Sequence, residues 1–369
     1  MYYGNNMKNV SVYVKGDRNS TAYYRIYQYL DNIEGVKCKY RMMMSPYIHN
    51  RYMPISKQSI WIKIYTYLHI YVRMLIALVK DVIFPPNVIV IHRRIISRFM
   101  PLSYRCLLIL LKYRQTKIIW DFDDNITESR EVSISTFRFY SRISNTIIVT
   151  HNFLKEMIPY KYQHKVMIMP TTDGDMYKYF EHNALNKQRL LDIDKELRLV
   201  WVATSSNLKY LNEIIPILEK TALEFYERNL NLKLNVVCDF PLQHSCKYLC
   251  VENIKWTRDS AINAMKYGHI GLMPLANNLF TKGKGGFKLV QYMSIGLPCI
   301  GSNVGYNSHV LYDGAGIIVN TNQDCEDAIK FLSTKEIWTQ YSIKAYNRWK
   351  TEFAYESNLD KWKCLFAID

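Results

Sequence analysis

The chain has 369 residues, which is enough for two domains that each bury a hydrophobic core. Its 48 Lys and Arg residues outnumber its 32 Asp and Glu residues, and the formal net charge is +16 at pH 7. This excess predicts attraction to an anionic partner, such as a phosphorylated substrate, a lipid surface or nucleic acid. The charge is spread along the chain and no nucleic-acid-binding motif occurs, so we do not expect a nucleic-acid partner.

The cysteines and the N-terminus favour a cytoplasmic protein. Eight cysteines are scattered without a Cys-x-x-Cys pair, which is typical of free thiols in a reducing compartment. The only cluster that resembles a metal site is His244, Cys246 and Cys250, and it lacks a fourth zinc ligand. The N-terminus has no apolar signal core. We therefore expect no metal, no cofactor and no secretion.

Apolar runs alternate with helical patterns from end to end, which predicts an α/β fold with layers of helices around parallel sheets. In the first half, the expected strands are Val10–Val14, Lys37–Met43, Asn87–His92, Lys117–Asp121, Thr146–Val149 and Lys165–Met169. Helical patterns lie between them at Ala22–Leu30, Ile60–Lys80, Leu102–Tyr113 and Asn152–Met157. A second series of strands is expected at Leu197–Ala203, Leu232–Cys238, His269–Met273, Pro298–Ser302 and Ala315–Val319.

These patterns divide the chain into two αβα domains. Residues 1–170 form the first domain, and the polar stretch 171–196 reads as a linker because it has little apolar periodicity. Residues 197–334 form the second domain. Residues 335–369 are predicted to be long amphipathic helices that pack back on the first domain.

The segment from Lys282 to Ile300 is the most informative stretch. A loop of sequence Lys-Gly-Lys-Gly-Gly opens a short helix that ends at Gly296, and an apolar strand follows. Glycines let the backbone approach an anion closely, the free N–H groups of a first helical turn point at it, and lysines supply charge. Taken alone, such a cluster is more often a flexible loop before an ordinary αβ unit.

The rest of the segment resembles the donor-binding motif of retaining GT-B glycosyltransferases of the family-4 type. That motif runs Lys-Leu-Leu-Glu-Tyr-Met-Ala-Ala-Gly-Leu-Pro-Val-Val and is followed by Ser-x-Val-Gly; here it reads Lys288 to Ile300 and then Ser302 to Gly305. The Glu-x7-Glu pair of the family falls on Gly283 and Gln291, so both carboxylates are missing. The resemblance implies a GT-B architecture of two Rossmann-like domains with a donor cleft between them.

The resemblance also implies roles for particular residues. The family's second Glu binds the donor ribose, so Gln291 would hold the ribose here, and we expect Gln291→Glu to be tolerated. Lysines and loop glycines would neutralise the diphosphate of a UDP- or GDP-linked sugar without a metal. The implied donor-binding set is Ser205, Lys209, Lys284, Gly285, Gly286, Lys288, Gln291 and Gly305.

Two other segments extend the resemblance. Trp201–Leu211 is similar to the opening strand and phosphate-side loop of the second domain, and His269–Leu275 is similar to an Asp-Ile-Gly-Leu-x-Pro-Leu strand, with His269 in place of Asp. Near the N-terminus, Lys15-Gly16-Asp17 and the segment around Arg25 resemble the acceptor-side loop and helix. The implied acceptor-side residues are Gly16, Arg25, His92, Arg93, Asp121 and Asp124.

Three carboxylates, Asp121, Asp123 and Asp124, follow the expected strand at Lys117–Asp121. One interpretation is the Asp-x-Asp loop of a haloacid-dehalogenase-like phosphatase, although no downstream metal motif follows. A second is the Asp-x-Asp metal site of GT-A enzymes. The third is a GT-B loop in which Asp123 lies near the anomeric carbon and is catalytic, and the fourth is a structural carboxylate that caps a helix.

The segment Ile60–Lys80 is rich in Trp, Tyr and aliphatic residues, which Lys63, His69, Arg73 and Lys80 interrupt. No uninterrupted apolar run approaches the ~20 residues that span a bilayer. Basic residues among aromatics are typical of an interfacial helix on an anionic membrane, but a buried helix with one basic face fits equally well.

We therefore expect a retaining, metal-independent glycosyltransferase that moves a sugar from a nucleotide donor to a hydroxyl acceptor. The expected acceptor is a lipid-linked glycan in surface polysaccharide assembly. The expected location is the cytoplasm, with peripheral attachment to the inner face of the membrane. The alternatives are the phosphatase, with Asp121 and Asp123 at its centre, and a catalytically silent GT-B relative that only binds nucleotide.

Overall fold

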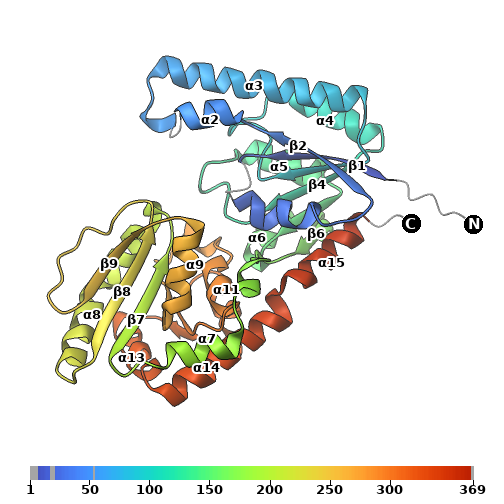
Figure 1. The fold of residues 1–369 in the computed structure, drawn as a ribbon. Helices are drawn as coiled ribbons and strands as arrows, with labels where there is room; N and C mark the ends of the chain where they lie inside the picture. The colour runs from blue at the N-terminus through green and yellow to red at the C-terminus, as the bar shows by residue number, and fades with distance from the viewer. Residues whose placement is uncertain (1–6, 17–20, 53–54, 367–369) are drawn as a thin grey trace, which may run out of the picture. The chain divides into compact units, whose positions relative to one another are not determined.

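The computed structural model describes residues 7–16, 21–52 and 55–366, and Asp17 lies outside this part. The chain divides into two compact units (Figure 1). Unit 1 comprises the chain up to Thr171 together with the segment from Asn358 onward, and unit 2 comprises Thr172–Ser357. Each unit has a six-stranded sheet in which all paired strands are parallel, with helices on its faces. The predicted α/β class and the two Rossmann-like domains are confirmed.

The sheet of unit 1 has the strand order β2-β1-β3-β4-β5-β6. Its strands are β1 (Lys8–Val14), β2 (Val36–Met42), β3 (Val88–His92), β4 (Lys117–Phe122), β5 (Thr146–Val149) and β6 (Val166–Ile168). Every residue of β3 is buried, as expected for a central strand of a parallel sheet that is covered on both faces. The register places His92 opposite Asp121, so two predicted polar residues meet at the carboxyl edge of the sheet.

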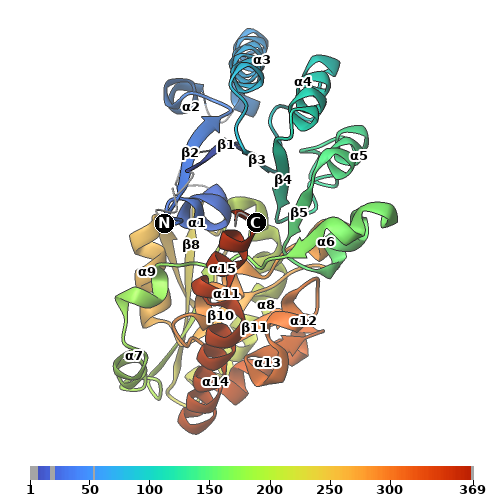
Figure 2. The same cartoon turned by 90° about the vertical axis from the view of Figure 1, so that its right-hand side faces the viewer.

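The helices of unit 1 are α1 (Gln28–Leu30, after a π-turn at Tyr23–Tyr27), α2 (Pro46–Tyr52), α3 (Ile60–Ile83), α4 (Leu102–Tyr113), α5 (Ile134–Ile143) and α6 (Asn152–Met157). Figure 2 shows α3, α4 and α5 as neighbours along one side of the unit. Their inner residues pack with strands β3, β4 and β5 in one core that includes Ile70, Leu108, Trp120 and Tyr140. At 24 residues, α3 is long enough and apolar enough on average to cross a bilayer, by length and composition only, although Lys63, Arg73 and Lys80 interrupt its apolar sequence.

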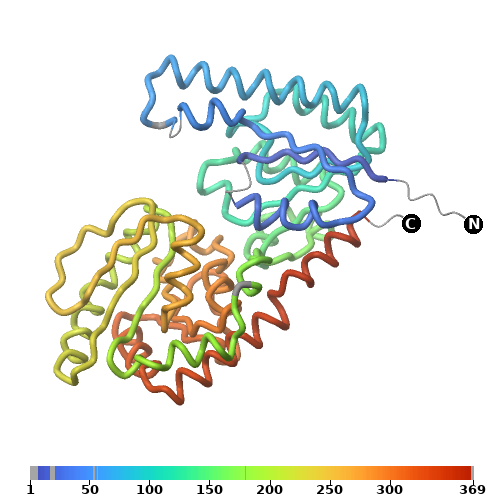
Figure 3. The backbone as a smooth tube through the Cα atoms, in the orientation of Figure 1, coloured from blue at the N-terminus to red at the C-terminus, as the bar shows by residue number. Residues whose placement is uncertain are grey.

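The sheet of unit 2 has the strand order β12-β11-β10-β7-β8-β9. Its strands are β7 (Glu196–Val202), β8 (Asn231–Cys238), β9 (Cys250–Lys255), β10 (Ile270–Met273), β11 (Cys299–Ser302) and β12 (Ile317–Val319). In the tube of Figure 3, β7, β8 and β9 run side by side, as their pairing requires.

The main helices of unit 2 are α7 (His182–Arg189), α8 (Leu208–Tyr226), α9 (Arg258–Tyr267), α10 (Leu279–Lys282), α11 (Phe287–Met293), α12 (Asn307–Val310), α13 (Asn322–Leu332) and α14 (Lys335–Arg348). The last helix, α15 (Tyr355–Phe366), begins in unit 2 and ends in unit 1. Helices α8 and α13 cover one core, and α9, α11 and the buried Trp349 enclose another. The last nine described residues of α15 belong to unit 1, where Asn358 Nδ2 donates to the carbonyl of Pro170 at 2.7 Å.

Candidate functional site

The Gly- and Lys-rich loop enters α11 through a left-handed glycine. Gly286 is the N-cap residue, with φ of 66°, and a Cβ at this position would lie 2.9 Å from Cγ2 of Val310. Both the dihedral angle and the packing therefore require glycine here. Helix α11 itself has only seven residues, so its dipole is short. The half-buried loop residues Lys284 and Gly285 supply the other groups that an anion would meet.

Gly305 holds this loop in place. Its φ is 60°, and a Cβ would lie 2.9 Å from the carbonyl oxygen of Thr281 and 3.0 Å from that of Lys282. Any larger residue would push away the end of α10, which leads into the loop. The structure thus gives Gly305 a packing function next to the predicted donor loop.

Lys288 and Gln291 lie one turn apart on α11 and contact each other. Lys288 Nζ donates to Gln291 Oε1 at 2.8 Å. Burial lowers the pKa of Lys288 to about 8, although Asp173 opposes this shift and Arg258 adds to it. Near neutral pH, Lys288 is therefore still mainly charged, but it exchanges its proton within the physiological range.

The other end of the Gln291 amide contacts Asp173. Gln291 Nε2 donates to Asp173 Oδ2 at 2.8 Å, and both residues are buried. Asp173 also accepts from Arg258 Nη2 at 3.2 Å and from the backbone N–H groups of Asp175 and Met176. A carboxylate thus lies directly beside the position where the family-4 motif carries its second Glu.

Asp173 and Arg258 were not among the residues predicted from the sequence. Asp173 lies in the stretch 171–196, which was expected to be a linker. In the structure this stretch contains α7, and its residue Asp173 contacts Gln291 of α11. The available signal is the cluster Asp173-Gly174-Asp175, which follows the expected strand Lys165–Met169 after three residues. Two carboxylates around a glycine at such a place require cationic or N–H partners.

Ser205 and Lys209 lie at the end of β7 and the start of α8. The Ser205 backbone N–H and hydroxyl donate to the two carboxylate oxygens of Asp239 at 2.6 and 2.9 Å. An anion at Ser205 would therefore compete with Asp239. Lys209 is exposed, and its Nζ lies 5.0 Å from the ring centroid of Tyr210.

A cavity of about 340 Å³ opens at the carboxyl ends of β10, β11 and β12. Open α/β sheets bind ligands at this edge. Residues that line it include Glu213, Asn277, Ser302, Asn303 and Thr321, and none of the predicted donor-binding residues is among them.

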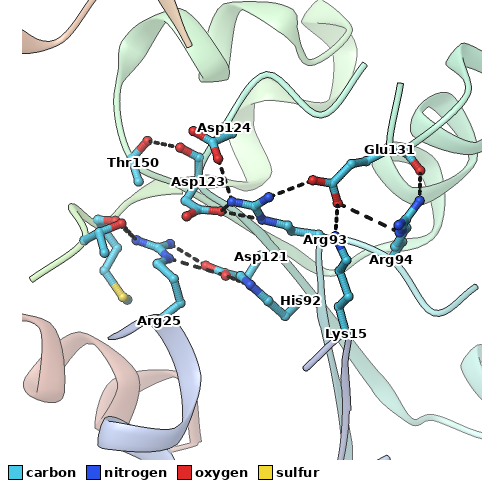
Figure 4. Close-up of polar contacts among 12 residues, drawn as sticks. Lys15, Arg25, His92, Arg93, Arg94, Asp121, Asp123, Asp124, Glu131 and Thr150 are labelled. Carbon is cyan, nitrogen blue, oxygen red and sulfur yellow. Dashed lines mark hydrogen bonds and ion pairs between the residues drawn. The ribbon is translucent and has the colours of Figure 1, made fainter. Parts of the chain in front are cut away.

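In unit 1, Asp121 is fully buried between two basic side chains (Figure 4). Arg25 forms a salt bridge with it through Nη2, and His92 Nδ1 lies 2.8 Å from its Oδ2. Burial alone would raise the pKa of Asp121, but Arg25 and His92 outweigh burial and lower it. Arg25 also donates to the carbonyl of Met169. This network joins the π-turn at Tyr23–Tyr27 to strands β3 and β4 and to Met169, the residue after β6.

Arg93 organises the other two carboxylates (Figure 4). It has a φ of 60°, and its guanidinium contacts Asp123 at 2.7 Å, Asp124 at 2.6 Å and Glu131 at 2.9 Å. These three carboxylates raise its pKa well above the ordinary value although burial opposes them. Arg94 and Lys15 reach the same Glu131 at 3.9 Å. The positive charges of Arg25 and Arg93, the arginines predicted on the acceptor side, are therefore neutralised by carboxylates within unit 1.

Gly16 was also predicted on the acceptor side. Its carbonyl oxygen accepts a hydrogen bond from the Tyr27 hydroxyl at 3.3 Å.

These pairings disfavour two interpretations of the acidic cluster. A phosphatase nucleophile must reach its substrate, whereas Asp121 is fully buried and bonded to Arg25 and His92. A GT-A metal site uses carboxylate oxygens as its ligands, whereas Asp123 Oδ1 and Asp124 Oδ2 each contact the Arg93 guanidinium, whose positive charge opposes a cation there. Among the described residues, no group of three His, Cys, Asp or Glu side chains has a metal-binding arrangement.

His269, which replaces an Asp of the family pattern, is a structural residue. It is fully buried; its Nδ1 accepts from the Arg198 N–H at 2.9 Å, and its Nε2 lies 2.9 Å from the Arg189 carbonyl. Burial, followed by the positive charge of Arg198, lowers its pKa to about 3. The side chain is thus a neutral imidazole that connects β7, α7 and β10.

Comparison with known proteins supports the fold only. No protein-family model and no curated protein sequence matches the chain. Among solved structures, HepE from Anabaena in complex with UDP has a TM-score of 0.66 at 10% identity, over 98% of this chain and 100% of that one. A glycosyltransferase from Rickettsia africae gives 0.64 at 11% identity, over 98% of both chains. Sucrose-phosphate synthase from Thermosynechococcus elongatus gives 0.60 at 12% identity, over 97% and 98%. The chain has the GT-B fold.

Proposed function

We propose that the protein is a retaining glycosyltransferase that transfers a sugar from a nucleoside diphosphate to a hydroxyl acceptor. The observation that carries this proposal is the segment from Lys284 to Gln291, where a left-handed glycine, two lysines and a buried amide gather at the start of α11. Lysines at a diphosphate stabilise the leaving group. UDP is the first nucleotide to test, because HepE was solved with UDP and with UDP-glucose.

The donor-binding residues of this proposal are Lys284, Gly285, Gly286, Lys288 and Gln291, with Ser205 and Lys209 at the start of α8. No metal is required if the lysines neutralise the diphosphate. The proposed catalytic residue is Asp123. Its Oδ1 accepts a hydrogen bond from Arg93 Nε at 2.8 Å, which would orient the carboxylate. Its carboxylate would stabilise positive charge that develops at the anomeric carbon.

The proposed acceptor is a lipid-linked glycan in surface polysaccharide assembly, and the proposed location is the cytoplasmic face of the membrane. The exposed apolar residues of α3 support a lipid-bound acceptor. Free cysteines throughout the chain support a reducing compartment.

A transfer assay with UDP-glucose and lipid extracts tests the activity. Asp123→Asn keeps the size and an acceptor oxygen but removes the charge, so we expect the rate to fall by about 10²–10³-fold while UDP affinity is unchanged. Nucleotide binding without transfer to any acceptor would favour the catalytically silent alternative.

A further inference from the structure

The outer face of α3 is apolar and uncovered. Trp61 is 76% exposed, and Ile64, Leu68 and Ile76 on the same helix are each about half exposed. The opposite face, with Ile70, Met74 and Leu78, is buried in the core of unit 1. A surface this apolar on one helix marks an interaction site.

Helix α4 extends this apolar surface. It packs beside α3, where the rings of Tyr71 and Tyr104 lie 5.4 Å apart and the Tyr104 hydroxyl donates to the Tyr71 carbonyl. Its exposed apolar residues are Leu102, Ile109, Leu110 and Tyr113. We call the exposed apolar residues of α3 and α4 together the apolar ridge; Figure 2 shows the two helices side by side.

A basic groove lies beside the ridge, between α4, α5 and the turn Tyr160–Lys165. It has a volume of about 410 Å³ and contains Arg105, Arg138, Arg142 and Lys161. The rings of Phe139 and Tyr162 lie beneath three of these cations at 4.9 to 5.8 Å. None of the four forms an ion pair with a carboxylate in the part of the chain that the structure describes.

A second hollow of about 540 Å³, between α3 and β2, repeats this combination on the other side of the ridge. Arg73 and Lys80 line it together with Tyr65 and Leu68. Both cations also lack a carboxylate partner among residues 7–16, 21–52 and 55–366. The ridge is therefore flanked by positive charge on both sides.

We propose that this face, the apolar ridge with its two flanking basic grooves, docks on an anionic lipid bilayer. The ridge would enter the boundary between headgroups and acyl chains, and the cations would bind lipid phosphates. Although α3 is long enough to span a bilayer, Ile70, Met74 and Leu78 hold it to the core, so the helix lies flat on the membrane. The inference rests on the membrane location in the proposed function, and it assigns the surface and the lipid charge that would carry that attachment.

Other occupants fit less well. A second copy of the chain in a two-fold dimer would bring the same cations against each other. Nucleic acid would match the grooves but would leave the ridge in water.

Co-sedimentation of the full-length protein with vesicles tests the proposal. We expect binding to vesicles of phosphatidylglycerol and phosphatidylcholine at low salt, about tenfold weaker binding to phosphatidylcholine alone, and a steep loss with added salt. Arg138→Gln, Arg142→Gln and Lys161→Gln combined should reduce partitioning about tenfold or more. The double change Trp61→Ser and Leu68→Ser should also reduce partitioning about tenfold or more, because less apolar area would enter the bilayer.

The matched control removes three exposed lysines of unit 2, through Lys187→Gln, Lys195→Gln and Lys350→Gln. It has the same net charge as the groove variant and should still sediment. Melting temperatures without lipid should agree for all variants, since the changed residues are exposed. The proposal is overturned if the wild type stays in the supernatant, if the control loses as much binding as the groove variant, or if the ridge instead forms a dimer in solution. UDP binding measured on the same preparation separates this result from the proposed enzyme function.

Discussion

Gln291 and Asp173 form a buried amide–carboxylate pair, in which the Gln291 Nε2 donates to Asp173 Oδ2 at 2.8 Å. The pair gives a physical reason for a glutamine at the position where the family-4 motif has a glutamate. A second carboxylate at position 291 would face that of Asp173 with no proton between them. The glutamine is thus used as a donor toward Asp173 and as an acceptor toward Lys288.

This geometry reverses the expectation that Gln291→Glu is tolerated. The substitution replaces a hydrogen bond with repulsion between two buried carboxylates, so we expect a loss of about 1–3 kcal/mol in the free energy of unfolding and weaker UDP binding. Urea unfolding without ligand and calorimetry with UDP measure the two effects.

The control is Gln323→Glu, which makes the same change beside Asp327 on an exposed helix face, where Gln323 Nε2 donates at 3.1 Å. Gln323→Glu should lower the free energy of unfolding far less than Gln291→Glu does. Combining Gln291→Glu with Asp173→Asn restores one amide and one carboxylate and should recover most of the stability. If Gln291→Glu alone behaves like the wild type, the pair has no role.

The pKa of Lys288 predicts how donor binding depends on pH. Because burial lowers this pKa to about 8, the ammonium that would face the diphosphate is present below pH 8 and is lost above it. UDP affinity should therefore fall about tenfold between pH 7 and 9. Calorimetry at several pH values should give a flat profile for Lys288→Gln, whereas Lys284→Gln keeps the slope because Lys288 remains. A wild-type profile without slope would rule out contact between Lys288 and the diphosphate.

Asp121 should be essential for folding and not only for activity. Asp121→Asn leaves the Arg25 guanidinium buried without its counter-ion, which typically costs about 3–5 kcal/mol. Urea unfolding measures this loss, and Asp327→Asn on the exposed surface serves as a control that should change little. A stable, fully folded Asp121→Asn protein that lost only catalysis would instead revive the phosphatase interpretation.

Because of His269, the free energy of unfolding should decrease as the solution becomes acidic. Its folded pKa of about 3 lies below the ordinary value of about 6.5, so its contribution is fully present above pH 6.5 and declines as the pH falls toward 3. The maximal slope from this one group is about 1.4 kcal/mol per pH unit. His269→Gln should flatten the pH dependence of unfolding between pH 6.5 and 4, whereas the exposed His164→Gln should not. Equal slopes in both variants would contradict this assignment.

The strands and helices with regular apolar patterns could be predicted closely. Helices α4 and α6 and strand β5 have the predicted bounds. In α4 the buried residues Tyr104, Leu108 and Leu111 repeat at helical spacing, and in β5 a short apolar run is buried. Strand β9 was missed because it is a mostly exposed edge strand with the sequence CVENIK. Helix α5 was missed because the polar residues Thr136 and Ser141 stand on its buried face.

The candidate site could be predicted only in part. The loop before α11 could be found because its glycines and lysines are adjacent in sequence. Asp173 is 118 positions from Gln291, and its role depends on a hydrogen bond that no local pattern encodes. Likewise, nothing in the sequence showed that Arg93 would satisfy the carboxylates of Asp123, Asp124 and Glu131.

The central claim, that the Lys284–Gln291 segment binds a nucleoside diphosphate sugar, is tested most directly by thermal unfolding with a panel of UDP- and GDP-linked sugars. A ligand that binds the folded state raises the melting temperature. The account predicts a shift with at least one nucleotide sugar, with UDP-linked sugars as the first choice, and a reduced or absent shift in the double variant Lys284→Gln and Lys288→Gln. No shift with any member of the panel, or an equal shift in the double variant, would contradict it.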